Sequence, residues 1–392
     1  MKKNIKILII IGISAMLILG ACAKNSSNST ENSNNDSTTK NVTYTKSDLF
    51  TDRDLEQNVS LDEAIKYNVS NNENITINKE GIYVISGTSK NTTIYVELGD
   101  EENVQIVLDG VSITNDNYPC VYVKSGDKVF ITTTNTKNTL SVTSSFKTDD
   151  STNLDGVIFS KSVLVLNGVG TLTINSTNNG VVSKDDLKIT GGTYNITAES
   201  KCFEANDSIR ISGGTFTLKA GTDALHAEYN DDDSVGYIYI CGGNININAG
   251  DDALHATTIV QIDDGNIEIN ASEGIEATQI QINGGNININ ASDDGINAAY
   301  KSKSIGTPVI EFNGGTVVID MGQGDTDGID SNGNIIVNGG TINVTAASTF
   351  DYDGTGTYNG GIIIANGKEI DYIPNQMMGG HGGGRGNRGY NR

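Results

Sequence analysis

Two columns of acidic and imidazole side chains recur at a regular spacing in the second half of the chain. The first column holds Asp223, Asp252, Glu273, Asp294 and Asp327, and the second holds His226, His255, Glu276, Asn297 and Asp330. Asp251 and Asp293 each directly precede a residue of the first column and add a second carboxylate there. If each column stacks on neighbouring strands, like charges face one another and repel. A cation between the strands would remove that repulsion.

Calcium is the cation that this pattern favours. Ca²⁺ takes about six to eight oxygen ligands in a loose geometry, and carboxylates, Asn side chains and backbone carbonyls supply them. The predicted ligands are Asp223, Asp251, Asp252, Glu273, Glu276, Asp293, Asp294, Asp327 and Asp330. The alternative is a solvated acidic ridge that keeps the protein soluble, since the chain carries a formal net charge of −22. The regular register of the charges, rather than their number, favours calcium.

His226 and His255 occupy one column on successive copies of the repeat. Two His residues flanked by Asp would suit zinc. A stacked pair of surface imidazoles is the simpler interpretation, and it is the one that the sequence favours.

A repeat of about twenty residues, running from Leu187 to Ala346, must position these columns. Its clearest copy, Ile280–Ala298, reads IQINGGNININASDDGINA and alternates apolar with polar residues on both sides of Gly-Gly. This alternation predicts strands, and the fixed period predicts units that bury their apolar faces against one another. We therefore expect an all-β, right-handed single-stranded parallel β-helix, a solenoid of roughly a dozen three-sided coils.

The N-terminus predicts export from the cytoplasm of a bacterium. Residues 1–21 combine three Lys with an apolar run that suits a signal peptide better than a membrane span. The following Cys22 completes a lipobox, Leu19-Gly20-Ala21-Cys22, so we expect a lipid on Cys22 that tethers the protein to the outer side of the cell membrane.

The rest of the chain divides by composition. Residues 22–47 are rich in Asn, Ser and Thr and predict a disordered tether, and residues 377–392 predict a Gly-rich flexible tail. Residues 48–376 form the predicted β-helix domain. A Ser-x-x-Glu pattern at Ser60 predicts a short helix that caps its N-terminal end.

Five segments of the chain resemble the bacterial extracellular carbohydrate-binding domain family, whose members are often lipoproteins. They are Thr76–Gly87, Val104–Asn115, Cys120–Thr132, Gly156–Asn175 and Asn179–Gly192. The resemblance covers roughly residues 50–373. It implies a parallel β-helix similar to that of pectate lyases, calcium held at the repeated Asp-Gly-Ile corners, and binding of plant-type polysaccharides, cellulosic or acidic. The chain departs from the corner pattern at Lys201-Cys202-Phe203 and at Glu273.

Non-catalytic polysaccharide binding by a monomer, with no nucleic-acid partner, is the function we expect. Polar side chains that point outward would form the binding face, and Tyr239 would add an aromatic platform to a chain without Trp. The residues predicted to contact carbohydrate are Asn246, Asn248, Glu268, Asn288, Asn290 and Tyr239. The same ladders of Asn and Thr would also stabilise such a fold without any ligand.

Two other functions stay open. A calcium-dependent polysaccharide lyase needs a base that removes the proton next to a uronate carboxylate, and Lys201, Lys301 and Lys303 are the bases near the acidic columns. A structural adhesin would use calcium only for rigidity.

Overall fold

The computed structural model describes residues 43–149, 152–322 and 326–376, and this part of the chain is all-β. Its only helices are two single turns, α1 (Lys46–Leu49) and α2 (Asp52–Leu55). The predicted signal peptide, the predicted lipidation site Cys22 and the predicted Gly-rich tail lie outside the described residues. No helix within the described ranges is long and apolar enough to cross a membrane.

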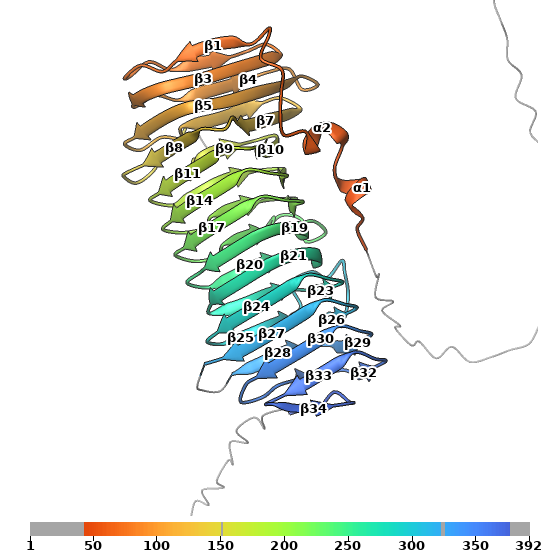
Figure 1. Cartoon of the computed structure of the whole chain (residues 1–392). Coiled ribbons are helices and arrows are strands. Elements are labelled where there is room, and N and C mark those ends of the chain that lie inside the picture. Colours follow the sequence, from red (N-terminus) through yellow and green to blue (C-terminus); the bar gives the residue numbers. More distant parts are fainter. Residues whose placement is uncertain (1–42, 150–151, 323–325, 377–392) are drawn as a thin grey trace, which may run out of the picture. The chain divides into compact units, whose positions relative to one another are not determined.

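The strands form two sheets (Figure 1). The larger sheet contains 22 strands: β1 (Ile65–Asn68), β3 (Gly81–Lys90), β5 (Asn103–Asn115), β7 (Lys128–Thr133), β8 (Lys137–Val142), β10 (Val163–Gly168), β11 (Thr171–Ser176), β13 (Asp186–Ile189), β14 (Thr193–Ala198), β16 (Ser208–Ile211), β17 (Thr215–Ala220), β19 (Tyr237–Asn248), β21 (Ile259–Ala271), β23 (Gln279–Ile282), β24 (Asn286–Ala291), β26 (Val309–Phe312), β27 (Thr316–Met321), β29 (Asn334–Val337), β30 (Thr341–Thr345), β32 (Gly356–Tyr358), β33 (Ile362–Ala365) and β34 (Lys368–Ile370). The smaller sheet contains 12 strands: β2 (Ile75–Ile77), β4 (Ile94–Glu97), β6 (Val121–Ser125), β9 (Gly156–Ser160), β12 (Asn179–Ser183), β15 (Phe203–Ala205), β18 (Leu225–Ala227), β20 (Asp252–Ala256), β22 (Glu273–Ala277), β25 (Asp294–Ala298), β28 (Asp327–Ser331) and β31 (Asp351–Tyr352). The strands pair in parallel, except for the terminal hairpin β33–β34.

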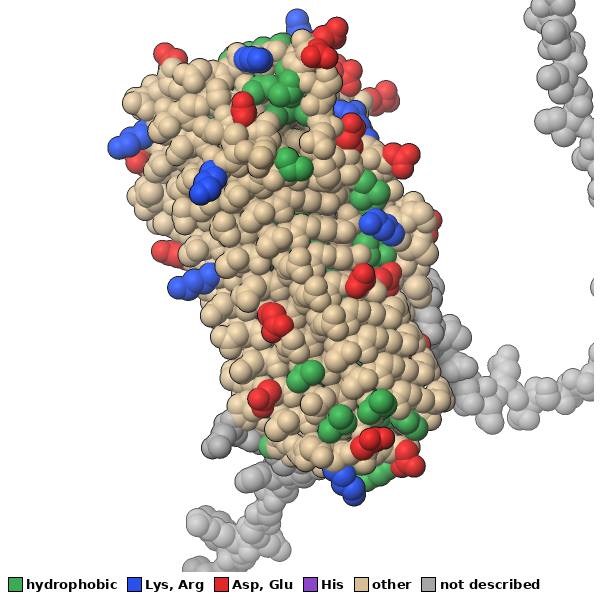
Figure 2. Space-filling model, in the orientation of Figure 1, with side chains coloured by type: hydrophobic (Ala, Val, Ile, Leu, Met, Phe, Trp, Pro, Cys, Tyr) green, Lys and Arg blue, Asp and Glu red, His purple; other side chains and the backbone are tan. Residues whose placement is uncertain are grey.

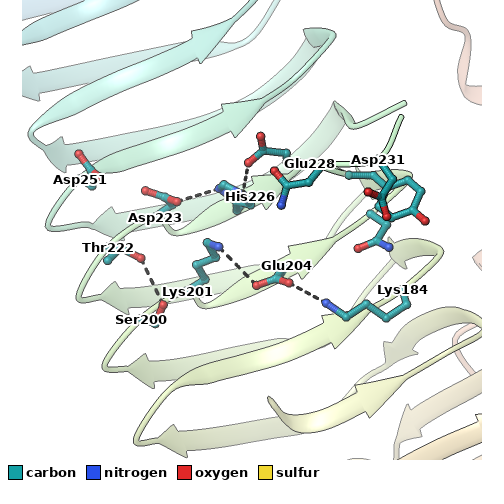
Figure 3. A pocket seen from close by; sticks show the side chains of 13 residues that line it. Lys184, Ser200, Lys201, Glu204, Thr222, Asp223, His226, Glu228, Asp231 and Asp251 are labelled. Carbon is teal, nitrogen blue, oxygen red and sulfur yellow. Dashed lines mark hydrogen bonds and ion pairs between the residues drawn. The ribbon is translucent and has the colours of Figure 1, made fainter. Parts of the chain in front are cut away.

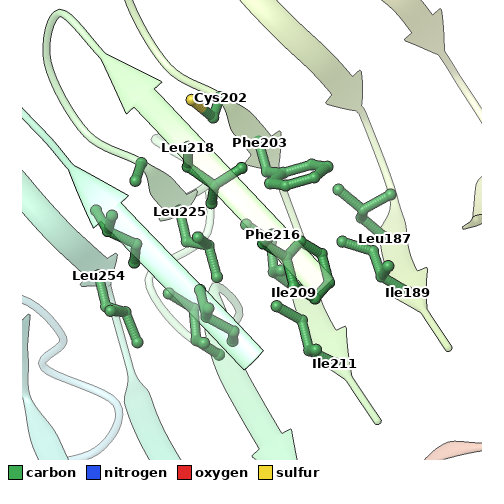
Figure 4. Close-up of a cluster of buried hydrophobic side chains, with 14 of the residues drawn as sticks. Leu187, Ile189, Cys202, Phe203, Ile209, Ile211, Phe216, Leu218, Leu225 and Leu254 are labelled. Carbon is green, nitrogen blue, oxygen red and sulfur yellow. The ribbon is translucent and has the colours of Figure 1, made fainter. Parts of the chain in front are cut away.

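Successive repeats pair so that buried apolar side chains lie opposite buried apolar side chains, which confirms the alternation read from the sequence. Ile287 on β24 lies between Ile267 on β21 and Val317 on β27, and all three side chains are at most 1% exposed. Figure 4 shows how such inward columns of Leu, Ile and Phe fill the space between the strands. Each of these side chains contributes about 1.5–3 kcal/mol by leaving water, so the stacked columns form the main stabilising core.

The prediction of a single-stranded β-helix with three-sided coils is wrong. We expected Gly-Gly to separate two faces, but β19 and β21 each run through that position, so the strand pieces on both sides belong to one 22-stranded sheet. Gly243 has a φ of 110°, which lets the strand bend there, and the pairing of β19 with β21 continues after a register shift. The all-β part of the prediction holds, with two parallel sheets in place of the solenoid.

The predicted capping helix at Ser60 is also wrong. The Ser60 hydroxyl hydrogen-bonds Asp62 instead of closing a box with Glu63, and Ile65–Asn68 forms strand β1 on the edge of β3. At the open edge of the sheet these residues form more backbone hydrogen bonds than they would in a helix of one turn. A capping box occurs earlier, where the Thr51 hydroxyl accepts from the backbone N–H of Asp54 at the start of α2.

The glycine of the Asp-Gly-Ile corner is required by close packing rather than by a positive φ. A Cβ atom on Gly295 would lie 2.4 Å from the carbonyl oxygen of Gly328 and 2.6 Å from Cγ2 of Ile319. A Cβ atom on Gly274 would lie 2.3 Å from the carbonyl oxygen of Gly295. The corner backbones of successive repeats therefore approach too closely for a side chain at these positions.

Gly295→Ala is expected to lower the free energy of unfolding by about 1–3 kcal/mol, because the backbone of the next repeat must shift to admit the methyl group. Urea unfolding of both proteins measures the loss. Gly99→Ala is the matched control, since its Cβ atom would meet nothing closer than 3.4 Å, at an exposed position. Equal stability of the two variants would contradict the packing argument.

Residues 43–58, which we call the N-terminal strap, pack against the outer side of the larger sheet. Tyr44 stacks on Tyr237 with 4.3 Å between ring centroids, and Leu49 and Phe50 bury Tyr239. Asp54 is completely buried. These contacts begin within the segment that composition predicts to be a tether.

Candidate metal-binding and carbohydrate-binding surfaces

The acidic columns lie along the smaller sheet, in register from strand to strand. Asp252 pairs with Glu273, and Asp294 pairs with Asp327. In the second column, the successive partners are Glu204, His226, His255, Glu276, Asn297, Asp330 and Asp351. We call this surface the acidic ridge. The structure therefore brings the predicted ligands onto one edge of adjacent strands, although Asp251 and Asp293 are exposed beside it.

In one half of the ridge the carboxylates are paired with Lys and His side chains of the protein itself, and Figure 3 shows the part of this half around Glu204 and Asp223. The ion pairs of this compensated half are Lys184–Glu204 at 2.9 Å, Lys201–Glu204 at 3.4 Å, His226–Asp223 at 2.8 Å, His255–Asp252 at 2.6 Å, His255–Glu276 at 3.0 Å and Lys301–Glu276 at 2.7 Å. Burial lowers the pKa of His255, but its two carboxylate partners outweigh burial and raise that pKa to about 10. Asp223, Asp252 and Glu276, three predicted calcium ligands, thus already have His or Lys side chains as partners.

The other half of the ridge has no such partners. Within the described residues, no Lys, Arg or His forms an ion pair with Glu273, Asp294, Asp327 or Asp330, which we call the uncompensated half. Burial, together with neighbouring carboxylates, raises the pKa of Glu273 to about 8, that of Asp294 to about 7 and that of Asp330 to about 6. These carboxylates are therefore held together against their mutual repulsion.

Two buried oxygen atoms have no hydrogen-bond partner, Oδ1 of Asp327 in the uncompensated half and Oδ1 of Asn297, which pairs with Asp330 in the second column. Unpaired buried acceptors are rare in folded proteins and call for an unplaced donor or ion. Oxygen ligands with no imidazole among them fit a hard cation such as Ca²⁺. The residues of this half thus fit calcium better than the complete predicted set does.

Only two groups of three His, Cys, Asp or Glu residues in the described ranges bring their ligand atoms within 4.8 Å of one another. One is His226, Glu228 and His255, and the other is Asp252, His255 and Glu276. A calcium ion in the uncompensated half would therefore need amide and backbone oxygens in addition to carboxylates. Both compact groups contain His255, which the sequence placed in a simple stacked pair.

Two of the three lysines considered as bases, Lys201 and Lys301, are held by carboxylates of the ridge. A general base must give up its proton near the working pH. Burial lowers the pKa of Lys301, but the ion pair with Glu276 outweighs burial and raises it above the ordinary value. Lys201 is likewise bound to Glu204. Neither amine is arranged to accept a proton from a substrate.

An exposed polar surface, which we call the amide face, lies on the larger sheet. It consists of Asn244, Asn246 and Asn248 on β19, Asn266, Glu268 and Asn270 on β21, and Asn286, Asn288 and Asn290 on β24. Side chains on adjacent strands hydrogen-bond one another: Asn266 donates to Asn244 at 3.0 Å, and Asn288 donates to Glu268 at 2.6 Å. Figure 2 shows a side of the molecule on which charged side chains are scattered over a surface of mostly uncharged side chains and backbone.

A shallow depression of about 370 Å³ lies at one end of the amide face, lined by Asn270, Asn290 and Ser272 among others. Five of the six residues predicted to contact carbohydrate, Asn246, Asn248, Glu268, Asn288 and Asn290, lie on this face. The strand register that aligns them follows directly from the repeat.

Tyr239 is the exception. Its side chain is 1% exposed beneath Leu49 and Phe50 of the strap, and its hydroxyl donates to Asp263 at 2.7 Å. It therefore cannot stack on a sugar at the surface. The strap lies almost 200 residues earlier in the chain, so the local pattern around Tyr239 contains no sign of this cover.

A cavity of about 630 Å³ beside the compensated half was not predicted from the sequence. Lys184, Glu204, His226, Glu228 and Asp231 are among its lining residues (Figure 3). Glu228 follows His226 by two residues, which on a strand places both side chains on one side. That spacing was a signal for a shared site, but Glu228 stands outside the repeated columns.

The fold and its surfaces thus define an all-β protein with a polar strand face and an acidic ridge. The chain belongs to the family described as carbohydrate-binding domain-containing protein, which matches residues 71–326. Family membership confirms the resemblance seen in the sequence. The lipid anchor and the calcium ions remain predictions.

Two known proteins are similar to parts of this chain. A carbohydrate-binding domain-containing protein of Acetivibrio thermocellus is 37% identical over 128 residues, which are 32% of this chain and 45% of the relative. The match thus spans less than half of that relative's length. The solved structure of a polysaccharide lyase-like protein from C. thermocellum, a gadolinium derivative, is 29% identical with a TM-score of 0.48, over 57% of this chain and 93% of that one.

Proposed function

We propose that this protein binds polysaccharide at the cell surface without cleaving it, and that the polymer lies across the amide face. The observation that carries the proposal is the in-register ladder of exposed Asn and Glu side chains on β19, β21 and β24. Membership of a carbohydrate-binding domain family supports it. The lipid on Cys22 would hold this surface outside the cell.

The amide face suits an extended sugar polymer for two physical reasons. Amide groups both donate and accept hydrogen bonds, as sugar hydroxyls do, and the face offers them on every strand. The strands and the ladder hydrogen bonds hold the side chains in place, so little side-chain freedom is lost on binding. Because the chain has no Trp, we expect affinity to come mainly from many polar contacts rather than from stacking.

We further propose that calcium in the uncompensated half of the ridge rigidifies the protein and supports binding of acidic polymers. The carboxylates there would otherwise repel a uronate chain. A bound divalent cation reverses the local charge and could coordinate a uronate carboxylate directly. Neutral polymers such as cellulose would not need this bridge.

A triple variant of the amide face tests the proposal. Asn246→Ala, Glu268→Ala and Asn288→Ala together are expected to weaken binding to cellulose or polygalacturonate about tenfold or more, because three sites for hydrogen bonds worth about 0.5–1.5 kcal/mol each are removed. Sedimentation with the insoluble polymer measures the affinity. Melting curves recorded in parallel separate a loss of binding from a loss of fold.

The matched control is Asn313→Ala with Asn338→Ala. These residues also form an exposed amide ladder, in which Asn338 donates to Asn313 at 2.7 Å, but they lie at the Gly-Gly turns outside the amide face. Unchanged affinity in the triple variant, or an equal loss in the control, would show that the amide face only stabilises the fold. Repeating the assay with chelator and polygalacturonate tests the bridging role of calcium separately.

A further inference from the structure

His226 and His255 are oriented by carboxylates in the way that histidine ligands of metals usually are. Their rings stack, with 4.6 Å between centroids and an interplanar angle of 17°. Nδ1 of His226 lies 2.8 Å from Asp223, and Nδ1 of His255 lies 2.6 Å from Asp252. A carboxylate hydrogen-bonded to Nδ1, as Asp252 is to His255, fixes the ring orientation and makes Nε2 the more basic, ligating nitrogen, and the close Asp223 carboxylate restrains the ring of His226.

Glu228 provides a third ligand next to these rings. Its Oε2 lies 3.1 Å from Nε2 of His226. Two donors that share one zinc ion, with bonds of about 2.0–2.1 Å at a tetrahedral angle, lie about 3.3 Å apart. Since the ligand atoms of His226, Glu228 and His255 all lie within 4.8 Å of one another, small side-chain rotations bring them onto one ion.

The site is enclosed on the protein side and open on the other. His226 is 9% exposed, and both His226 and Glu228 line the cavity of about 630 Å³. This cavity leaves room for a water molecule or an incoming ligand in a fourth position. An arrangement of three protein ligands and one open position is typical of accessible zinc sites.

We propose that His226, Glu228 and His255 bind one divalent transition metal ion of the zinc class. This site is separate from the proposed calcium sites, because two of its three ligands are imidazole nitrogens, which zinc accepts and calcium disfavours. Asp223 and Asp252 are positioning residues that hold the two rings. Binding displaces any proton on the ligating nitrogens, so metal and protons compete for the site and binding weakens as the pH falls.

Cobalt and zinc titrations of the whole protein test the proposal. Both are carried out with excess calcium, so that oxygen-ligand sites are filled. One equivalent of Co²⁺ is expected to give the intense visible absorption of a tetrahedral centre, and one equivalent of Zn²⁺ is expected to abolish it. Calorimetry of Zn²⁺ binding gives the stoichiometry and the dissociation constant independently of colour.

Two single variants and one control decide the assignment. His226→Gln and Glu228→Gln are each expected to weaken Zn²⁺ binding at least tenfold. The control is His381→Gln, because His381 is the remaining histidine of the chain and belongs to the Gly-rich tail. Melting curves without metal identify any variant that fails to fold. Glu228 is only half-buried whereas His226 is buried, which makes Glu228→Gln the safer test.

Zn²⁺ binding that persists in both site variants would overturn the proposal, and so would binding that is lost in the His381 variant alone. Displacement of Co²⁺ by excess calcium would also overturn it, since the ion would then occupy an oxygen site. Because the readout is metal binding, the result does not depend on whether the amide face binds polysaccharide.

Discussion

Asp54→Ala is expected to lower the free energy of unfolding by about 3–5 kcal/mol, the largest stability effect we expect from one substitution. Asp54 is completely buried and accepts from the ammonium groups of Lys128 and Lys188, both at 2.9 Å. Burial raises the pKa of Asp54, but these hydrogen bonds outweigh burial and hold it below its ordinary value. Removing the carboxylate leaves the buried Lys188 without its counter-ion.

The same substitution is expected to release the N-terminal strap. Asp54 also accepts from the backbone N–H of Thr51, and its own backbone carbonyl accepts from the Thr190 hydroxyl, so it joins α2 to the larger sheet. Urea unfolding measures the stability, and limited proteolysis between residues 43 and 58 measures release of the strap. Because the pKa of Asp54 is lowered in the folded protein, its contribution is present at neutral pH and is lost as the pH falls through that pKa.

Glu97→Ala is the matched control, since Glu97 forms an ion pair with Lys124 at 3.0 Å in which both side chains are at least 36% exposed. We expect that variant to lose less than about 1 kcal/mol. Comparable losses in the two variants, or a strap that stays resistant to protease without Asp54, would show that the buried pairs do not secure the strap.

The strand alternation and the charge columns could be predicted from the sequence because both are local and periodic. Ile280, Ile282 and Ile287 are buried as the alternation predicts, and the columns stay in register because each repeat pairs with the next. The division into sheets was not predictable in this way. Whether Gly242-Gly243 ends a strand or bends it depends on hydrogen bonds to neighbouring repeats, which the residue types do not reveal.

The contacts of the candidate site residues could be predicted only where both interacting residues lie within the repeat. Lys184 and Lys301 pair with carboxylates of the ridge from outside the two columns, so counting carboxylates alone did not show which of them already have partners. The burial of Tyr239 depends on a segment almost 200 residues away. Long-range contacts of this kind leave no trace in the spacing of nearby residues.

The uncompensated half of the ridge gives the protein a pH-dependent stability that calcium should remove. In chelator, we expect the melting temperature to fall as the pH is raised from about 5 to about 8, because Asp and Glu have pKa values of about 4 in the unfolded chain. In the folded protein, the pKa values of Glu273, Asp294 and Asp330 are raised to about 8, 7 and 6. At pH values between the unfolded-state and folded-state pKa values, the folded state binds more protons than the unfolded state. The free energy of unfolding therefore decreases as the pH rises.

Calcium is expected to raise the melting temperature by roughly 5 °C or more at pH 8 and by much less at pH 5. At a free concentration about 100 times its Kd, a ligand that binds only the folded state adds about 2.7 kcal/mol to the free energy of unfolding. At pH 5, protons already neutralise the ridge and compete with calcium. Differential scanning calorimetry with calcium, magnesium and chelator at both pH values measures these shifts.

Substitutions in the uncompensated half separate a calcium site from a merely acidic surface. Asp294→Asn with Asp330→Asn keeps the side-chain size while removing two charges, so in chelator at pH 8 we expect this variant to melt above the natural protein and to gain nothing from calcium. Asp251→Asn, at an exposed position beside the ridge, should behave like the natural protein. If calcium raises the melting temperature of the double variant as much as that of the natural protein, the ion binds elsewhere. If the melting temperature of the natural protein in chelator does not change with pH, these carboxylates do not destabilise the fold.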